Sequence, residues 1–273
     1  MNHPSLSSAL RAGRRVYATA VVSPSPLWPA ALAAAGVDFV FIDTEHTPLD
    51  RHAVAWMCRL SRAAGVPPVV RIPSPDPFEA CKVLDAGACG IIAPYIETAD
   101  QVRALSGVTR FRPVKGRRLA EAIEDPESLE PELREYLERR NIESLLVVNI
   151  ESIPAMENLD EILAVPGLDA VLIGPHDLSC SLGIPEQYRH ERFEAAVREI
   201  IRRARAAGVG AGIHYWAGLD QEIAWAQAGA NLIMHSSDLA LFSQGLKREL
   251  GEIRRALGDD EQSQPNPEGP RET

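Results

Sequence analysis

Short apolar runs alternate with helix-like segments along this chain of 273 residues. Segments of helical period lie between the runs, for example at 27–35, 53–63 and 191–207. This alternation predicts an α/β protein, and at this length the expected fold is a single (β/α)8 TIM barrel. A doubly wound sheet is the alternative, but no Gly-x-Gly-x-x-Gly turn follows the first run. The apolar runs are VYATAVV, VDFVFI, PPVVRI, GIIAPY, SLLVVNI, LDAVLIG, GVGAGIHY and NLIMHS.

Two segments depart from the alternation. Residues 117–143 are charged and helical in pattern, which predicts a helical insertion between the fourth and fifth strands, either a solvated surface helix or a lid or subunit contact. Residues 258–273 contain almost no apolar side chain and are expected to be disordered. The barrel domain is therefore expected to cover residues 1–257.

Composition and charge narrow the classes of partner. Hydrophobic residues make up 45% of the chain and aromatic residues only 5%, so small aliphatic side chains fill the core, as in a parallel sheet covered by helices. The net charge of −10 argues against a nucleic-acid-binding protein, which needs a basic surface for phosphates. No apolar stretch is long enough to cross a membrane, so no membrane partner and a cytoplasmic location are expected.

Ionisable residues directly follow several of the predicted strands. A barrel forms its active site at the carboxyl ends of its strands, so polar side chains placed there indicate a functional site. Loops are polar in any protein, and the informative feature is the position directly after buried apolar runs. The residues concerned are Asp43, Glu45, His46, Arg71, Asn149, Glu151, His176, Asp177, His214, His235 and Ser236.

Glu151 and Asp177 follow strands five and six, which are neighbours in a barrel. Adjacent strands lie about 5 Å apart, so the two carboxylates can share one cation. Two carboxylates completed by water and substrate oxygens are typical of Mg²⁺ or Mn²⁺. Helix capping explains the same residues equally well, and from the residues alone both interpretations stay open.

The other strand-end residues also have two interpretations. Arg71 is either a buried ion-pair partner or a donor to an oxygen that becomes negative during a reaction. His46 is a general base, a helix cap or a ring that donates to Asp43. The turn at 174–177 supplies either backbone N–H groups for an anion or ordinary turn residues.

Taken together, these stretches resemble the HpcH/HpaI aldolases, the class II, metal-dependent pyruvate aldolases. The matching stretches are GVDFVFIDTEH, VVRIP, KVLDAGACGIIAPYIETADQV, ENLDEILAVPGLDAVLIGPHDLSCSLG and AAGVGAGI, in family order from Gly36 to Ser237. Asp-x-Glu-His followed at this separation by Gly-Pro-x-Asp-Leu-Ser makes the resemblance specific.

The resemblance implies a (β/α)8 barrel that assembles as a homohexamer, a trimer of dimers that exchange the last helix. It implies reversible cleavage of a 4-hydroxy-2-oxo acid, such as a 2-keto-3-deoxy sugar acid, to pyruvate and an aldehyde. The pyruvate enolate would be stabilised by a divalent cation, Mg²⁺ or Mn²⁺ before Co²⁺ or Zn²⁺, on Glu151 and Asp177.

The resemblance also assigns roles to single residues. Arg71 would bind the substrate and stabilise the enolate oxygen, and His46, oriented by Asp43, would transfer protons. Asn149 stands where relatives usually carry Gln and is expected near the substrate. The backbone of the following turn would hold the pyruvate carboxylate. That turn consists of Gly174, Pro175, His176 and Asp177.

Some positions depart from the family pattern. His176 replaces a small residue found in many relatives, and its side chain either narrows the site, donates a proton or points away. His214 and His235 are either substrate contacts or satisfied core histidines. Glu45 is expected to bond to Arg71 or a neighbouring loop, or to complete a subunit contact.

Two other functions stay open for the same residues. One is another enolate-forming lyase, a decarboxylase or a condensing enzyme acting on an oxaloacetate-like 2-oxo acid. The other is a non-catalytic barrel that binds a ligand through the metal site. The aldehyde partner and the stereochemistry are not specified by the residues.

Overall fold

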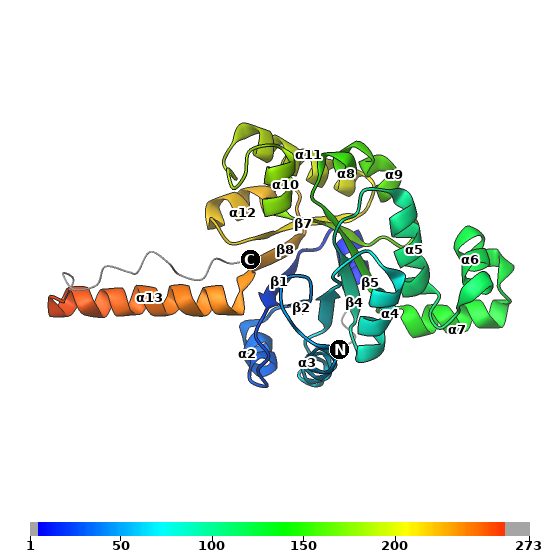
Figure 1. The fold of residues 1–273 in the computed structure, drawn as a ribbon, viewed down its shortest axis with the longest axis horizontal. Helices are drawn as coiled ribbons and strands as arrows, with labels where there is room; N and C mark the ends of the chain where they lie inside the picture. The colour runs from blue at the N-terminus through cyan, green and yellow to red at the C-terminus, as the bar shows by residue number, and fades with distance from the viewer. Residues whose placement is uncertain (1–4, 260–273) are drawn as a thin grey trace.

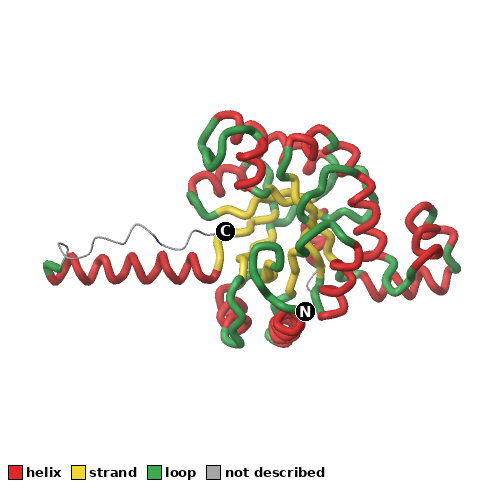
Figure 2. The backbone as a smooth tube through the Cα atoms, viewed as in Figure 1, coloured by secondary structure: helices red, strands yellow, loops and turns green. Residues whose placement is uncertain are grey.

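The computed structural model describes residues 5–259, and its centre is a closed barrel of eight parallel strands (Figures 1 and 2). Each strand pairs with the next one along the chain, and β8 pairs with β1 to close the ring. The predicted barrel is therefore confirmed. The strands are β1 (Val16–Val21), β2 (Phe39–Asp43), β3 (Pro68–Arg71), β4 (Gly90–Ala93), β5 (Leu145–Ile150), β6 (Ala170–Ile173), β7 (Gly210–Tyr215) and β8 (Leu232–Ser237).

Helices surround the strands and join them in sequence (Figure 2). Capping residues fix the start of several: the side chains of Asp50, Asp76 and Thr98 accept hydrogen bonds from the first turns of α3, α4 and α5. The helices are α1 (Leu6–Arg11), α2 (Trp28–Ala35), α3 (Arg51–Ala63), α4 (Pro77–Ala86), α5 (Ala99–Arg110), α6 (Gly116–Glu124), the 3-10 helix η1 (Pro126–Ser128), α7 (Pro131–Asn141), α8 (Ile153–Glu157), α9 (Leu159–Leu163), α10 (Pro175–Ser181), α11 (Glu191–Ala206), α12 (Leu219–Gln227) and α13 (Asp238–Leu257).

The hydrophobic core has two layers, because successive strand residues point to opposite faces of the sheet. Phe41, Val147 and Met234 belong to the cluster that fills the barrel interior. Ile42 and Val148 belong to the larger cluster between the sheet and the helices. The strands are thus buried on both faces, which is why they appear in the sequence as continuous apolar runs.

Between α5 and β5 the chain forms α6, η1 and α7, which protrude at the right of Figure 1. This unit contains the segment 117–143 and has a small apolar cluster formed by Ala122, Leu129 and Leu137. The segment is therefore more than a single solvated helix, because three of its apolar side chains are fully or almost fully buried.

The last helix, α13, leaves the barrel as an arm (Figure 1). Leu239, Phe242, Leu246 and Ile253 recur at helical spacing along it and are all exposed. Of the predicted disordered tail, residues 260–273 lie outside the described part of the chain. The short helix α1, which precedes β1, was not predicted from the sequence.

Within residues 5–259, every helix is too short or too polar to cross a membrane. The cytoplasmic location stays a prediction.

Candidate active site

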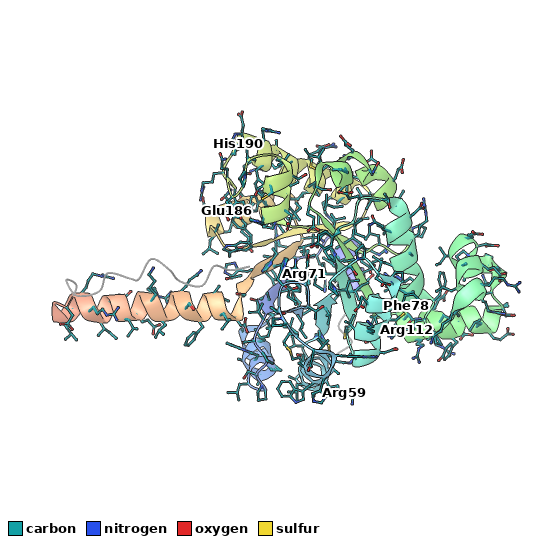
Figure 3. All side chains as sticks on the ribbon, in the orientation of Figure 1. Arg59, Arg71, Phe78, Arg112, Glu186 and His190 are labelled. Atoms are coloured by element: carbon teal, nitrogen blue, oxygen red, sulfur yellow. The ribbon has the colours of Figure 1, made fainter. Side chains whose placement is uncertain are left out.

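The alternation of strand side chains places the polar residues at the C-terminal end of the barrel. Asp43, Arg71 and Asn149 stand two residues after Phe41, Val69 and Val147, which fill the interior, and so face the same way. Figure 3 shows Arg71 near the middle of the barrel. The interior-facing positions at or just beyond the ends of the strands are Asp43, Arg71, Asn149, Glu151, Gly174, His214 and Ser236.

Arg71 is held between two carboxylates from the end of β2. Its Nε lies 2.9 Å from Asp43 Oδ1 and its Nη2 lies 2.5 Å from Asp43 Oδ2, which is a bidentate pair. Its Nη1 lies 3.1 Å from Glu45 Oε2, close enough for an ion pair but not aligned as a hydrogen bond. The guanidinium also lies 5.3 Å from the centre of the Phe41 ring.

The burial of this ion pair affects the pKa of both partners. Burial alone would raise the pKa of Asp43, but the hydrogen bonds and charge of Arg71 outweigh it and hold that pKa below its usual value. Burial would lower the pKa of Arg71, and the bonds and charge of Asp43, followed by the charges of Glu45 and Glu151, raise it instead. Both groups are therefore ionised at neutral pH.

His46 lies at the rim and is not oriented by Asp43 as the sequence analysis expected. Both oxygens of Asp43 accept hydrogen bonds from Arg71, and Oδ1 also accepts from the backbone N–H of Glu45. The nearest carboxylate to the imidazole is instead Glu45, with Oε2 3.9 Å from His46 Nε2. No Asp43–His46 hydrogen bond or ion pair is among the described contacts, because Arg71 occupies both oxygens of Asp43, and the proton-transfer role of His46 stays a prediction.

Glu151 is buried, and within residues 5–259 it accepts hydrogen bonds only from neutral donors. Its Oε1 accepts from the backbone N–H of Tyr95 at 2.7 Å, and its Oε2 accepts from Asn149 Nδ2 at 2.9 Å. Burial raises the pKa of Glu151 against these hydrogen bonds, and the charge of Asp177 raises it further. Asn149 therefore positions Glu151, while its own Oδ1 is buried and has no hydrogen-bond partner in the part of the chain that the structure describes.

Glu151 and Asp177 meet at Gly174, the residue that precedes α10. A Cβ on Gly174 would stand 2.6 Å from Glu151 Oε2 and 3.6 Å from Asp177 Oδ2. The glycine therefore leaves space between two acidic oxygens that any larger residue would fill. No Lys, Arg or His within residues 5–259 forms an ion pair with either carboxylate.

These donors fit a divalent cation of the hard, oxygen-preferring kind. Two carboxylates that follow the neighbouring strands β5 and β6 border one space, and neither forms an ion pair within the described residues. In the described part of the chain, no group of three or more His, Cys, Asp or Glu side chains is arranged to hold a metal by itself. A cation here would therefore complete its coordination with water or substrate oxygens.

The first turn of α10 provides backbone donors beside these carboxylates. The cap residue, Gly174, has no side chain to accept a hydrogen bond, and Pro175 has no N–H. The imidazole of His176 is exposed and lies 3.8 Å from Glu186 Oε1 through Nδ1 and 3.8 Å from Cys180 Sγ through Nε2. These contacts leave the role of the His176 side chain at the substrate a prediction.

The two additional histidines lie on opposite faces of the sheet. His214 faces the interior, packs edge-on against Phe41 and has Nε2 3.0 Å from the carbonyl oxygen of Ser236. Burial lowers the pKa of His214 to about 4, so the ring is neutral at pH 7. His235 faces outward instead, with Nδ1 2.8 Å from Glu222 Oε2 on α12.

With this geometry established, the chain can be compared with known proteins. Residues 21–244 match the family model described as HpcH/HpaI aldolase/citrate lyase. The chain belongs to the HpcH/HpaI aldolase/citrate lyase family. The family resemblance inferred from the sequence is therefore confirmed.

Relatives within the family are similar over most of the chain. The 2-keto-3-deoxy-L-rhamnonate aldolase of Klebsiella pneumoniae subsp. pneumoniae is 34% identical over 80% of this chain and 81% of its own. The crystal structure of an HpcH/HpaI aldolase from Desulfitobacterium hafniense DCB-2 has a TM-score of 0.79 at 28% identity, covering 92% of this chain and 97% of that one. Citrate synthase SbnG has the same TM-score at 29% identity, covering 92% and 98%. The aldolase relatives support a lyase activity.

Sequence reasoning missed one member of the site, Tyr95. Tyr95 lies in one of the stretches that resemble the family, but nothing in the sequence marked it as a member of the site. The informative signal is conformational: its φ of +56° is unusual for a bulky residue, and a sequence does not display it.

Proposed function

We propose that the protein is a divalent-metal-dependent aldolase that reversibly cleaves a 4-hydroxy-2-oxo acid to pyruvate and an aldehyde. The single observation that carries this proposal is the buried carboxylate of Glu151, which faces Asp177 and forms no ion pair with a Lys, Arg or His of the described residues. The curated relatives that act on 2-keto-3-deoxy-L-rhamnonate support a 2-keto-3-deoxy sugar acid as the substrate class.

The cation would be Mg²⁺ or Mn²⁺, since both are hard ions that prefer oxygen ligands, with Co²⁺ or Zn²⁺ as less suited replacements. When bound to Glu151 and Asp177, it would supply Lewis-acid stabilisation of the oxygen on C2 of the substrate. Asn149 would hold Glu151 in place for this purpose through its amide.

Arg71 would stabilise the negative charge that develops when the C3–C4 bond breaks. A guanidinium has five N–H donors. Asp43 uses two of them and Glu45 lies against a third, so donors remain for an enolate oxygen. Because the two carboxylates fix both ends of the guanidinium, it is already oriented before charge develops.

His46 would move the proton in this reaction. In the cleavage direction its imidazole takes the proton of the C4 hydroxyl, directly or through water, as the C3–C4 electron pair passes to the pyruvate enolate and the aldehyde leaves. The enolate carbon C3 then takes up a proton to give pyruvate. The half-exposed position of His46 at the rim suits exchange with solvent.

The carboxylate of the 2-oxo acid would bind at the start of α10. The backbone N–H groups of His176 and Asp177 belong to the first turn of that helix, where N–H groups lack intrahelical partners. Gly174 has no side chain to cap the helix, and Pro175 has no N–H to compete for the carboxylate. The backbone of this turn, rather than the His176 imidazole, would therefore orient the substrate carboxylate.

The protein is further proposed to form a homohexamer in which paired subunits exchange α13. The exposed apolar stripe of this 20-residue helix supports that assembly, because an isolated amphipathic arm gains stability only by burying its apolar face. Light scattering on the intact chain tests the mass of the assembly.

The experiment that tests the aldolase proposal measures pyruvate release from a panel of 2-keto-3-deoxy sugar acids, with Mg²⁺ or Mn²⁺ and after EDTA treatment. We expect Glu151→Gln to lower kcat/KM on the order of 10³-fold, about 4 kcal/mol of transition-state stabilisation. Glu157→Gln is the matched control, because Glu157 is exposed on α8 and its replacement should leave kcat/KM unchanged. Full activity after EDTA, or in Glu151→Gln, contradicts the proposal.

A second candidate is an enzyme that forms the same enolate from, or condenses it with, an oxaloacetate-like acid. The structural similarity to citrate synthase SbnG supports this second candidate. Relative kcat/KM for oxaloacetate decarboxylation against aldol cleavage ranks the two, and a higher value for oxaloacetate would replace the aldolase assignment.

A further inference from the structure

A cavity lies between the segment that joins α10 to α11 and the segment that joins β7 to α12. Its volume is about 470 Å³, within the range of cavities that bind small molecules. Figure 3 shows two of its lining residues, Glu186 and His190, in the upper part of the view. Neither segment contains a residue to which the proposed reaction assigns a role.

The lining of this cavity combines aromatic rings with hydrogen-bonding groups. The rings are those of Tyr188 and Tyr215, whose centres lie 5.9 Å apart at an interplanar angle of 82°. His190 Nδ1 accepts a hydrogen bond from the first turn of α11, so the neutral ring carries its proton on Nε2 and can donate it. Gln187 adds an amide. Ring faces combined with such donors and acceptors fit the C–H and hydroxyl groups of a polyol.

Trp216 connects this cavity with the interior of the barrel. It directly follows β7, is 38% exposed, and has its ring centre 6.4 Å from that of Tyr188. The same ring centre lies 5.7 Å from that of His214. His214 packs in turn against Phe41, over which the guanidinium of Arg71 lies. These rings therefore form a continuous series from Arg71 to the cavity.

The cavity also adjoins the helix that would bind the substrate carboxylate. Glu186, which lines the cavity, has Oε1 3.8 Å from Nδ1 of His176. His176 belongs to the first turn of α10 and directly precedes Asp177. The cavity is thus next to the proposed cation site on one side and continuous with the barrel interior through Trp216 on the other.

We propose that Trp216 is a specificity-determining residue, over which the hydroxylated aldehyde half of the substrate lies as it extends toward this cavity. The inference rests on the proposed function and adds to it the place where the aldehyde half binds. A polyhydroxylated aldehyde gains contacts with Trp216, Tyr188 and His190, whereas acetaldehyde is too short to reach them. The site would therefore prefer 2-keto-3-deoxy sugar acids to a 4-hydroxy-2-oxo acid that carries only a methyl group beyond C4.

Pyruvate release from two substrates, with Mg²⁺ present, tests this role. One is a six-carbon 2-keto-3-deoxy sugar acid, and the other is 4-hydroxy-2-oxopentanoate, whose aldehyde half is acetaldehyde. We expect Trp216→Ala to lower kcat/KM for the sugar acid roughly tenfold, mainly through KM, and to leave the short substrate within about twofold. Trp216→Phe keeps a ring and should stay within about threefold of wild type on both substrates. Trp56→Ala is the matched control, because Trp56 is 36% exposed on α3, and it should match wild type.

A second variant fills the cavity and leaves Trp216 in place. Ala217 is exposed and lines the cavity, so Ala217→Leu should also lower kcat/KM for the sugar acid and spare the short substrate. Equal losses on both substrates in Trp216→Ala, or a preference for the sugar acid that neither variant changes, would overturn the inference.

A binding measurement separates this inference from the proposed function. A wild-type chain that releases no pyruvate from either substrate would contradict the proposed function, and quenching of tryptophan fluorescence by the sugar acid would then decide the role of Trp216. Quenching that is lost in Trp216→Phe and kept in Trp56→Phe supports the inference. Quenching that persists in Trp216→Phe, or no quenching of wild type, overturns it.

Discussion

Two buried acidic residues lie at opposite ends of the neighbouring strands β5 and β6, and their surroundings differ. Asp169 precedes β6 at the N-terminal end of the barrel and is fully buried. Its Oδ1 accepts from Ser7 and Arg11, and its Oδ2 accepts from Arg110 and from the backbone N–H of Leu146. Every oxygen of this carboxylate thus has partners, and two guanidinium groups balance its charge.

Glu151 follows β5 at the C-terminal end and has no such balance. Its partners are a backbone N–H and the amide of Asn149, and its neighbour across Gly174 is a second acid, Asp177. The difference indicates that the N-terminal acid stabilises the fold, while the C-terminal acid maintains a charge imbalance that a ligand can remove. Barrel enzymes generally divide their two ends in this way.

The largest expected effect is a difference in activity between variants at the two ends of the barrel. Asp177→Asn should lower kcat/KM for pyruvate release on the order of 10³-fold, because half of the proposed cation site is lost. Asp169→Asn should leave kcat within about threefold below its melting range, because only the opposite end changes. Steady-state assays of both variants make the comparison, and similar losses in the two would show that the ends do not divide the roles.

The next effect separates them by stability. Asp169→Asn should lower the free energy of unfolding by about 1–3 kcal/mol, because it removes the counter-charge of the partly exposed Arg11 and Arg110 and weakens their hydrogen bonds to this buried position. Asp177→Asn should change it by less than about 1 kcal/mol without added metal, since it removes a repulsive charge from beside Glu151. Urea unfolding with EDTA present measures both, and a larger loss in Asp177→Asn would reverse the comparison.

The smallest effect concerns pH at the C-terminal end. The folded pKa of His214, about 4, lies below the ordinary value of about 6.5. Between these values the unfolded chain takes up a proton that the folded chain does not, so this histidine lowers the free energy of unfolding as pH falls. From pH 7 to pH 5 the loss should be about 2 kcal/mol, at 1.4 kcal/mol per pKa unit.

His214→Gln tests this, because glutamine can still donate to the carbonyl of Ser236 but does not titrate. The difference in unfolding free energy between variant and wild type should shift in favour of the variant between pH 7 and pH 5. An unchanged difference would mean that the imidazole protonates as freely in the fold as in the unfolded chain.

The sequence predicted which residues lie at the strand ends better than it predicted which side chains they contact. Asp43, Arg71 and Glu151 could be found because a buried strand that ends in charge is informative. The partner of Arg71 could not be assigned, because Asp43 and Glu45 both come within its reach and only the folded geometry places Asp43 on Arg71 rather than on His46.

Other parts of the structure depend on information that a local pattern lacks. The left-handed backbone of Tyr95 results from contacts with Glu151 and Gln101, which lie elsewhere in the chain. The periodicity of α13 predicts a helix with an apolar stripe. It does not predict where the helix packs, because the stripe itself does not show which surface it contacts.

The central claim is that Glu151 and Asp177 form a site for a divalent cation, and calorimetric titration of metal-stripped protein with Mn²⁺ tests it most directly. Wild type and Glu157→Gln should bind Mn²⁺ with the same affinity at a single site per chain. Glu151→Gln and Asp177→Asn should each abolish that binding or weaken it by at least about 100-fold, about 3 kcal/mol. Unchanged Mn²⁺ affinity in both variants would contradict the account.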